Sequence, residues 1–257
     1  MKRTDYNRVS KNYDENRQRQ RIHADDALAK SLQNYSFSAP FRVLDLGCGT
    51  GTYLHTQKDA FTSEFDGGQI EWFGLDASQA MLEQARPKVP GADLQVGDVH
   101  SLPYPDGHFN FISCNFAFHH FEDKGKALDE IHRVTASGGT FKIWNIQPER
   151  MPGWWVYRYF PQACLEDSER FWGEQRLWLE LEKRGFSVKI KSSRTLRRRA
   201  VQEIIEDIDR RDISELANLD DQDYLKGRAA VRALQSAAAE VRIPDEFAQL
   251  TCIAVKK

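Results

Sequence analysis

The sequence of 257 residues has no long apolar run. A helix that crosses a bilayer needs roughly 20 predominantly apolar residues, and the most apolar stretch, residues 109–121, is interrupted by asparagine and histidine. Residues 1–21 are polar and lack the apolar segment of a secretory signal. We therefore expect no membrane span and a cytoplasmic protein.

The sequence also has few cysteines and a small net charge. The four cysteines include no C-x-x-C pair, which argues against a zinc ribbon or a thioredoxin-type site, and no other spacing predicts a bound metal. The 36 basic and 38 acidic residues give a net charge of −2, so nothing attracts the whole chain to nucleic acid or anionic lipid. The basic cluster, defined as the arginines at 194, 197, 198 and 199, is followed by four acidic residues. We interpret it as the exposed face of a helix, with phosphate binding as the alternative.

Between residues 39 and 147, short apolar runs alternate with helix-like segments. Strands are predicted at residues 41–46, 70–75, 93–96, 109–114 and 140–146, and helices at 78–86 and 124–135. Pro87 is expected to end the first of these helices. Such alternation predicts an α/β fold with a doubly wound parallel sheet and right-handed crossovers.

Segments of different character flank this core, and we interpret the whole chain, 1–257, as one domain. Residues 1–38 are polar with a helical tendency, and the α/β core follows at 39–147. Residues 148–173 form an aromatic insertion, which either lines a pocket, mediates dimerisation or packs as a core of its own. Residues 174–257 should contain a helix at 174–184, strands at 186–191 and 250–255, and a helical cap at about 192–249.

The most informative motif is a glycine turn after the first strand, in which Asp45 is followed by Gly47, Gly49 and Gly51. Glycines there permit positive φ angles and let a ligand approach the backbone. A dinucleotide-binding fingerprint needs Gly or Ala where this chain has Thr52, and a P-loop needs a Gly-Lys-Ser/Thr that is missing. The motif that remains resembles the first motif of the class I S-adenosylmethionine-dependent methyltransferases.

Two further motifs resemble the same family. Asp76 ends the second strand, where a carboxylate can accept hydrogen bonds from both hydroxyls of a ribose. Its alternative role is to cap the helix that starts near Ser78 or to form an Asx turn before it. Residues 97–104 resemble the adenine motif, in which Asp98 would bind the exocyclic amine and the backbone N–H of Val99 a ring nitrogen.

After the fourth strand, the sequence F-H-H-F at residues 118–121 is similar to the branch that contains the ubiquinone and menaquinone biosynthesis methyltransferases (type 11). Residues 133–140 resemble the turn before the fifth strand, with Thr, Ala and Ser replacing the usual Leu, Lys and Pro. Tyr6, Tyr13 and Arg17 look like part of the lid found in this branch. The resemblance implies a Rossmann-like seven-stranded sheet with an antiparallel last strand, plus helical insertions.

The resemblance also implies the cofactor S-adenosylmethionine and the product S-adenosylhomocysteine. The residues expected to contact them are Asp45, Gly47, Cys48, Gly49, Gly51, Asp76, Ala77, Met81, Asp98, Val99 and Asn115. His119 is the candidate general base, because an imidazole with a pKa of about 6.5 suits deprotonation of a hydroxyl or amine.

The expected reaction is methyl transfer by in-line displacement to an oxygen, nitrogen or carbon of a small molecule, by a monomer or homodimer. We expect no nucleic-acid partner, since the fourth motif of the DNA N-methylating enzymes and the Pro-Cys nucleophile of the cytosine enzymes are missing. The alternatives are a non-catalytic module that binds either ligand and an RNA-modifying methyltransferase that uses the basic cluster.

Overall fold

The computed structural model describes residues 23–62, 64–65, 69–211, 213–237 and 241–257. The predicted lid residues Tyr6, Tyr13 and Arg17 lie outside the described residues. The described residues divide into two compact units. The first contains residues 23–145, 174–191 and 251–257, and the second contains residues 146–173 and 192–250.

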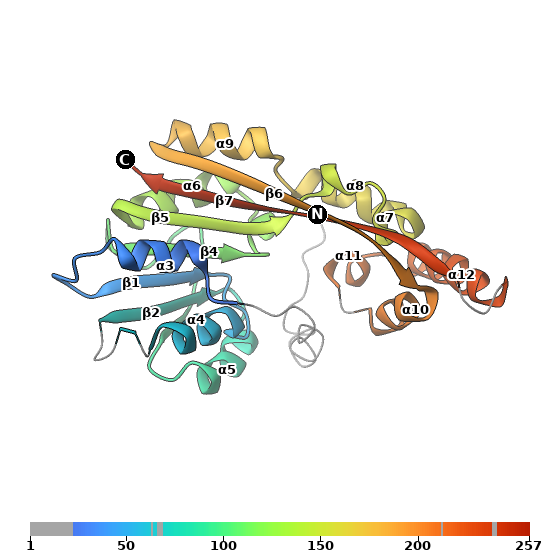
Figure 1. Ribbon diagram of the computed structural model, residues 1–257, viewed down its shortest axis with the longest axis horizontal. Helices are drawn as coiled ribbons and strands as arrows, with labels where there is room; N and C mark the ends of the chain where they lie inside the picture. Colours follow the sequence, from blue (N-terminus) through green and yellow to red (C-terminus); the bar gives the residue numbers. More distant parts are fainter. Residues whose placement is uncertain (1–22, 63, 66–68, 212, 238–240) are drawn as a thin grey trace. The chain divides into compact units, whose positions relative to one another are not determined.

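Seven strands of the described chain form one sheet in the order β3-β2-β1-β4-β5-β7-β6. Their bounds are β1 Phe41–Leu46, β2 Ile70–Asp76, β3 Asp93–Val96, β4 Phe109–Asn115, β5 Thr135–Ile146, β6 Phe186–Ala200 and β7 Arg242–Lys256. The strands from β3 to β5 pair in parallel, and β7 runs opposite to β5 (Figure 1). The predicted doubly wound sheet with an antiparallel last strand is confirmed.

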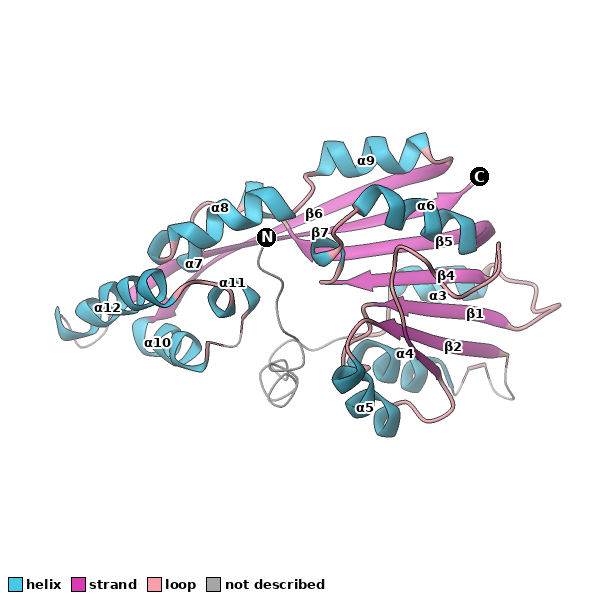
Figure 2. Ribbon diagram, turned by 180° about the vertical axis from the view of Figure 1, so that it is seen from behind, coloured by secondary structure: helices cyan, strands magenta, loops and turns pink. Residues whose placement is uncertain are grey.

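The order of the strands determines where a ligand can bind. From β1 the chain proceeds outward through β2 to β3 and then returns to the other side of β1 with β4. The register places Asp45 of β1 opposite Gly74 of β2 and Ser113 of β4, and the arrowheads of these strands point to the same edge (Figure 2). Open α/β sheets bind ligands at the carboxyl ends of the strands where the order reverses, which here are β1 and β4.

Helices of the first unit cover this sheet. They are α3 Asp26–Gln33, α4 Thr52–Thr62, α5 Gln79–Lys88, α6 Lys124–Val134 and α9 Glu174–Lys183. Leu28 of α3, Leu54 of α4 and Leu82 of α5 are fully buried in one cluster with Val43 and Phe111 of the sheet. Removing such apolar side chains from water contributes about 25 cal/mol per Å², so these helices are held by packing on the strands.

Several predicted boundaries differ from the structure, and β5 for example starts at Thr135 and not at residue 140. Pro87 lies inside α5, which ends one residue later, at Lys88. The helical cap predicted at 192–249 is shorter, since residues 192–200 belong to β6 and residues 242–249 to β7. The helices between them are α10 Val201–Arg210, α11 Ser214–Ala217 and α12 Asp221–Ala237.

The basic cluster therefore lies on a strand, and its interpretation as a helical face is wrong. Arg194 and Arg197 of β6 form ion pairs with Glu246 and Asp245 of β7, both of which are nearly fully buried. Arg199 pairs instead with Asp207 of α10, at 2.7 Å. The acidic partners on β7 are far away in sequence, so the local pattern of charges suggested a helix.

The second unit has an aromatic core. Residues 148–173 contain the helices α7 Trp155–Tyr159 and α8 Pro161–Arg170, and the side chains of Trp154, Trp155, Tyr157 and Phe160 are buried. A Cβ on Gly227 of α12 would stand 2.3 Å from the Phe160 ring, so that helix packs directly on the ring. Of the three roles considered for these aromatics, the burial supports a core of this unit's own.

Candidate functional site

The glycine turn connects β1 to α4. Gly47, Gly49 and Gly51 have φ angles of +69°, +53° and +77°, and the N–H groups of Gly47 and Cys48 donate to the carbonyl oxygen of Leu75. A Cβ on Gly47 would lie 2.5 Å from the Cβ of Ala117, in the loop after β4. The turn therefore touches both neighbouring strand ends, and only glycine combines this backbone with this proximity.

Asp76 joins the end of β2 to the glycine turn. Its Oδ2 accepts from the N–H of Gly49 at 2.8 Å, and its Oδ1 accepts from the N–H of Ser78 at 2.9 Å. The N-cap of α5 is Ser78, whose hydroxyl accepts from the N–H of Met81, so Asp76 is not the cap. Its bond from the N–H of Ser78, two residues on, is the Asx turn considered as the other alternative. Burial raises the pKa of Asp76, and the hydrogen bonds from the backbone oppose that rise.

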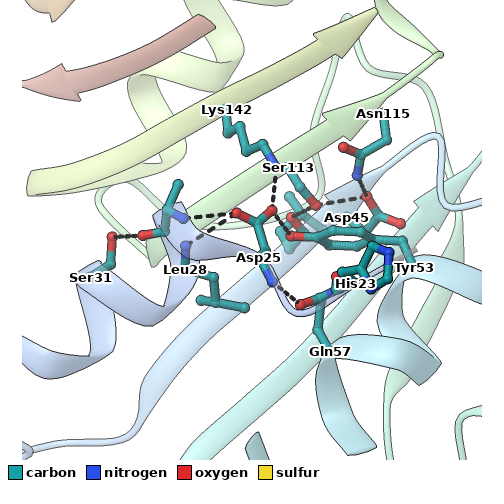
Figure 3. A network of polar contacts seen from close by, with 12 residues as sticks. His23, Asp25, Leu28, Ser31, Asp45, Tyr53, Gln57, Ser113, Asn115 and Lys142 are labelled. Atoms are coloured by element: carbon teal, nitrogen blue, oxygen red, sulfur yellow. Dashed lines mark hydrogen bonds and ion pairs between the residues drawn. The ribbon is translucent and has the colours of Figure 1, made fainter. Parts of the chain in front are cut away.

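Asp45 is buried at the carboxyl end of the central strand (Figure 3). Its Oδ1 accepts from the hydroxyl of Ser113 at 2.7 Å and from the amide nitrogen of Asn115 at 3.3 Å. Burial raises the pKa of Asp45 from 3.8 to about 7, although both hydrogen bonds lower it. The amide oxygen of Asn115 is buried and has no hydrogen-bond partner among the described residues.

A second buried carboxylate, which the sequence analysis did not single out, adjoins this one. Asp25 caps α3, accepts from the hydroxyl of Tyr53 at 2.7 Å and forms an ion pair with Lys142 of β5 (Figure 3). Burial and the nearby charges of Asp25 and Asp45 raise the pKa of Tyr53, so both carboxylates act on this one phenol. The adjacent acidic residues at 25 and 26, ahead of an apolar helical pattern, are the signal that could have revealed this cap.

The remaining predicted contacts lie in the glycine turn, in α5 and in the loops that follow β2 and β3. Asp98 is exposed, whereas Val99 is buried and Ala77 is exposed. Met81 is 1% exposed, so its side chain belongs to the core and presents little surface to a ligand. Burial raises the pKa of the Cys48 thiol well above its usual value, so this residue contributes a neutral side chain.

The loop after β4 brings aromatic and imidazole groups to the same edge of the sheet. Phe116 has a φ of +52°, its N–H donates to the carbonyl oxygen of Trp144 at 2.8 Å, and the two rings lie 4.6 Å apart. A positive φ at a bulky residue is strained and often marks a functional loop. His119 is buried, and its Nδ1 lies 3.2 Å from the amide nitrogen of Asn145.

Solved structures with the same fold are methyltransferases. The YcgJ protein of Bacillus subtilis aligns with 90% of this chain and 98% of its own, at a TM-score of 0.57 and 19% identity. Phosphoethanolamine N-methyltransferase 2 of Haemonchus contortus, solved with S-adenosyl-L-methionine, aligns with 99% of this chain and 58% of its own, at a TM-score of 0.59 and 18% identity. The fold is that of the class I methyltransferases.

The sequence comparisons show similarity to methyltransferases in the first part of the chain. Residues 43–139 match the model of a methyltransferase domain. The demethylmenaquinone methyltransferase of Thermus thermophilus is 35% identical over 132 residues, which are 49% of this chain and 57% of that protein. The chain spans about half the length of the curated relatives it matches. The match at residues 43–139 agrees with the methyltransferase family that the motifs resemble.

The close approach of Gly47 to Ala117 leads to a test by substitution. Gly47→Ala and Gly138→Ala both place a methyl group on a glycine of positive φ, +69° and +72°, but a Cβ at Gly138 meets nothing within 4 Å. We expect about 1–2 kcal/mol of backbone strain in both variants and roughly 1–3 kcal/mol more in Gly47→Ala from overpacking. Urea unfolding measures both. Equal losses would mean that the turn and the loop after β4 are not in contact.

The raised pKa of Asp45 predicts how stability changes with pH. The carboxyl has a pKa of about 7 in the folded protein and of about 3.9 in an unfolded chain. Between these values the folded state binds the proton more tightly, so a rise in pH lowers the free energy of unfolding. We expect the wild type to lose stability relative to Asp45→Asn from about pH 4 to about pH 7, as measured by urea unfolding.

The exposed Asp59 of α4 provides the control for this experiment, because Asp59→Asn removes a carboxylate whose side chain is 68% exposed. Because an exposed ion pair such as the one with His55 contributes little to stability, the difference of this variant from the wild type should change much less over the same pH range. A wild-type advantage over Asp45→Asn that grows with pH would show that the pKa of Asp45 is lowered on folding, contrary to the buried environment seen here.

Proposed function

We propose that this protein binds S-adenosylmethionine at the carboxyl ends of β1, β2 and β4 and transfers its methyl group to a small-molecule acceptor. The observation that carries the proposal is the connection between Asp76 and the glycine turn. The backbone N–H groups of Gly49 and Ser78 hold the two carboxylate oxygens in place at the end of β2. A fixed carboxylate beside a glycine turn with open backbone is suited to bind a ribose.

The donors and acceptors present fit the other parts of this cofactor. Asp45 and the amide oxygen of Asn115, which is buried without a partner among the described residues, would accept from the ammonium group of its amino-acid moiety. Asp98 and the backbone of Val99 would hold the adenine, and Gly47 and Gly51 would allow the close approach. Cys48 and Ala77 would contribute van der Waals contacts beside these groups.

Bound there, S-adenosylmethionine would supply an electrophilic methyl group on a cationic sulfur. The work of the chain is to align the acceptor in line with that group and to exclude water. The paired rings of Phe116 and Trp144 lie at the same edge and offer faces that favour a nearby cation. The products are the methylated acceptor, S-adenosylhomocysteine and, for a hydroxyl or amine, a proton.

His119 is the proposed acceptor of that proton. Its Nδ1 faces the amide nitrogen of Asn145, a donor, so in this arrangement Nδ1 accepts and Nε2 carries the proton of the neutral ring. To act as a base through Nε2, the ring would need the amide of Asn145 to present its oxygen instead. The orientation of the Asn145 amide therefore determines which nitrogen of the neutral His119 ring carries the proton.

The names of similar proteins do not agree on one acceptor, since they refer to demethylmenaquinone in one case and to phosphoethanolamine in another. An RNA acceptor finds no support from the basic cluster, because Arg194, Arg197 and Arg199 all pair with carboxylates. The described residues also include no helix that is long and apolar enough to span a bilayer. A small molecule, bound by a monomer or homodimer in the cytoplasm, remains our proposal.

Binding of S-adenosylhomocysteine to Asp76→Asn tests the cofactor site. Calorimetry should show that the wild type binds both S-adenosylmethionine and S-adenosylhomocysteine, and saturation at 100 times the dissociation constant should add about 2.7 kcal/mol of stability. Asp76→Asn replaces one charged acceptor, so we expect affinity to fall by roughly tenfold or more. Asp59→Asn should bind like the wild type.

Each outcome separates the candidate functions. A folded wild type that binds neither ligand would overturn the proposal. Binding without methyl transfer to any acceptor in a broad small-molecule screen would favour the non-catalytic module. Transfer to RNA that weakens steeply with salt would favour the RNA-modifying alternative.

The role of His119 is tested by the pH dependence of kcat/KM with an acceptor found in that screen. If His119 is the base, His119→Gln should lower kcat/KM by roughly 10²-fold or more and remove the acidic limb of the profile, along which protonation of the base lowers activity. His132→Gln, on α6 against Phe186, is the matched control and should keep the wild-type profile. An unchanged profile in His119→Gln would exclude His119 as the base.

A further inference from the structure

His100 lies two residues after Asp98, in the loop that follows β3. Its ring nitrogen Nδ1 is 2.6 Å from Oδ1 of Asp98, and its backbone N–H donates to the same oxygen at 3.0 Å. Its other ring nitrogen, Nε2, lies 3.2 Å from the backbone nitrogen of Asp123, the residue that caps α6. One imidazole thus joins two loops at the candidate site.

These contacts determine where the proton of the ring resides. A backbone N–H can only donate, so Nε2 of His100 must accept from Asp123. The proton of the neutral ring is then on Nδ1, which donates to Oδ1 of Asp98. The side chain of His100 is 18% exposed, whereas that of Asp98 is 68% exposed, so the ring is held inside while the carboxylate reaches outward.

The same loop is held against α6 at several other points. The N–H of Leu102 donates to Glu130 at 2.8 Å, and Arg133 donates to the carbonyl oxygens of Leu102 and Tyr104. These bonds hold the backbone of the loop. The imidazole of His100 extends the connection to the side chain of Asp98, because it is anchored at Asp123 and donates to the carboxylate.

We propose that His100 is a positioning residue for recognition of the exocyclic amine of adenine by Asp98. By engaging Oδ1, His100 fixes the rotation of the carboxylate and directs Oδ2 to the amine. The proposal rests on the proposed function, since it needs the adenine to lie beside Asp98. The hydrogen bonds from His100 also lower the pKa of Asp98, which keeps the carboxylate ionised and a strong acceptor.

Two ligands that differ only in the amine distinguish this role from a general structural one. S-adenosylhomocysteine carries the amine, and its 6-deamino purine analogue does not. The wild type should prefer the first ligand, and His100→Ala should lose most of that preference, a change of roughly three- to tenfold. Affinity for the analogue should stay close to that of the wild type, because the analogue makes no bond that Asp98 could lose.

Two isosteric variants sharpen the test. The side-chain nitrogen of Asn can take the place of Nδ1 and donate to Asp98, so His100→Asn should restore most of the preference. The longer Gln places its amide near the position of Nε2, so His100→Gln should behave like His100→Ala. His55→Ala is the matched control, since His55 and Asp59 form a second His–Asp pair, 3.4 Å apart, on the exposed face of α4.

The outcomes separate this proposal from the proposed function. If the wild type binds neither ligand, the proposed function fails. If the wild type binds S-adenosylhomocysteine and His100→Ala weakens both ligands equally, or keeps the full preference for the amine, the positioning role is wrong while the proposed function stands.

Discussion

The burial of Asp45 at the centre of the sheet is the constraint on which the site depends. An isolated carboxylate in such a place is costly, and the chain supplies hydrogen bonds from Ser113 and Asn115 of the neighbouring strand. Those donors are available only because β4 returns beside β1 in parallel register. The same return creates the reversal of strand order at which open α/β sheets bind ligands.

The sequence predicts the first five strands and their parallel arrangement well, because buried parallel strands are short apolar runs and the motifs occur at their ends. It predicts the second unit poorly. Charges four residues apart favour a helix when only neighbours in sequence are considered, but Arg194 and Arg197 find their partners on β7. A strand whose charges are balanced by a distant strand gives no local signal of that pairing.

The residues of the candidate site also divide into those that local motifs predict and those that depend on distant partners. Asp45, Asp76 and the glycines belong to contiguous motifs at strand ends, so their proximity follows from the parallel sheet. Asp25, Lys142 and His100 come from separate elements, and each acquires its place through long-range hydrogen bonds or ion pairs. These contacts follow from the tertiary arrangement and not from any local pattern, so the sequence indicates no role for these residues, although His100 lies within the motif at 97–104.

The contact between Gly47 and Ala117 has a consequence for how this protein can change over evolution. The methyl group of Ala117 fills the space where a side chain at 47 would stand, so the two positions share one small volume. Neighbours that share a cavity do not vary independently. The loop after β4 could accept a larger residue at 117 only by moving away from the glycine turn. The outer residues of that loop can therefore vary in size, whereas the residue at 117 cannot become larger while the glycine turn stays in place.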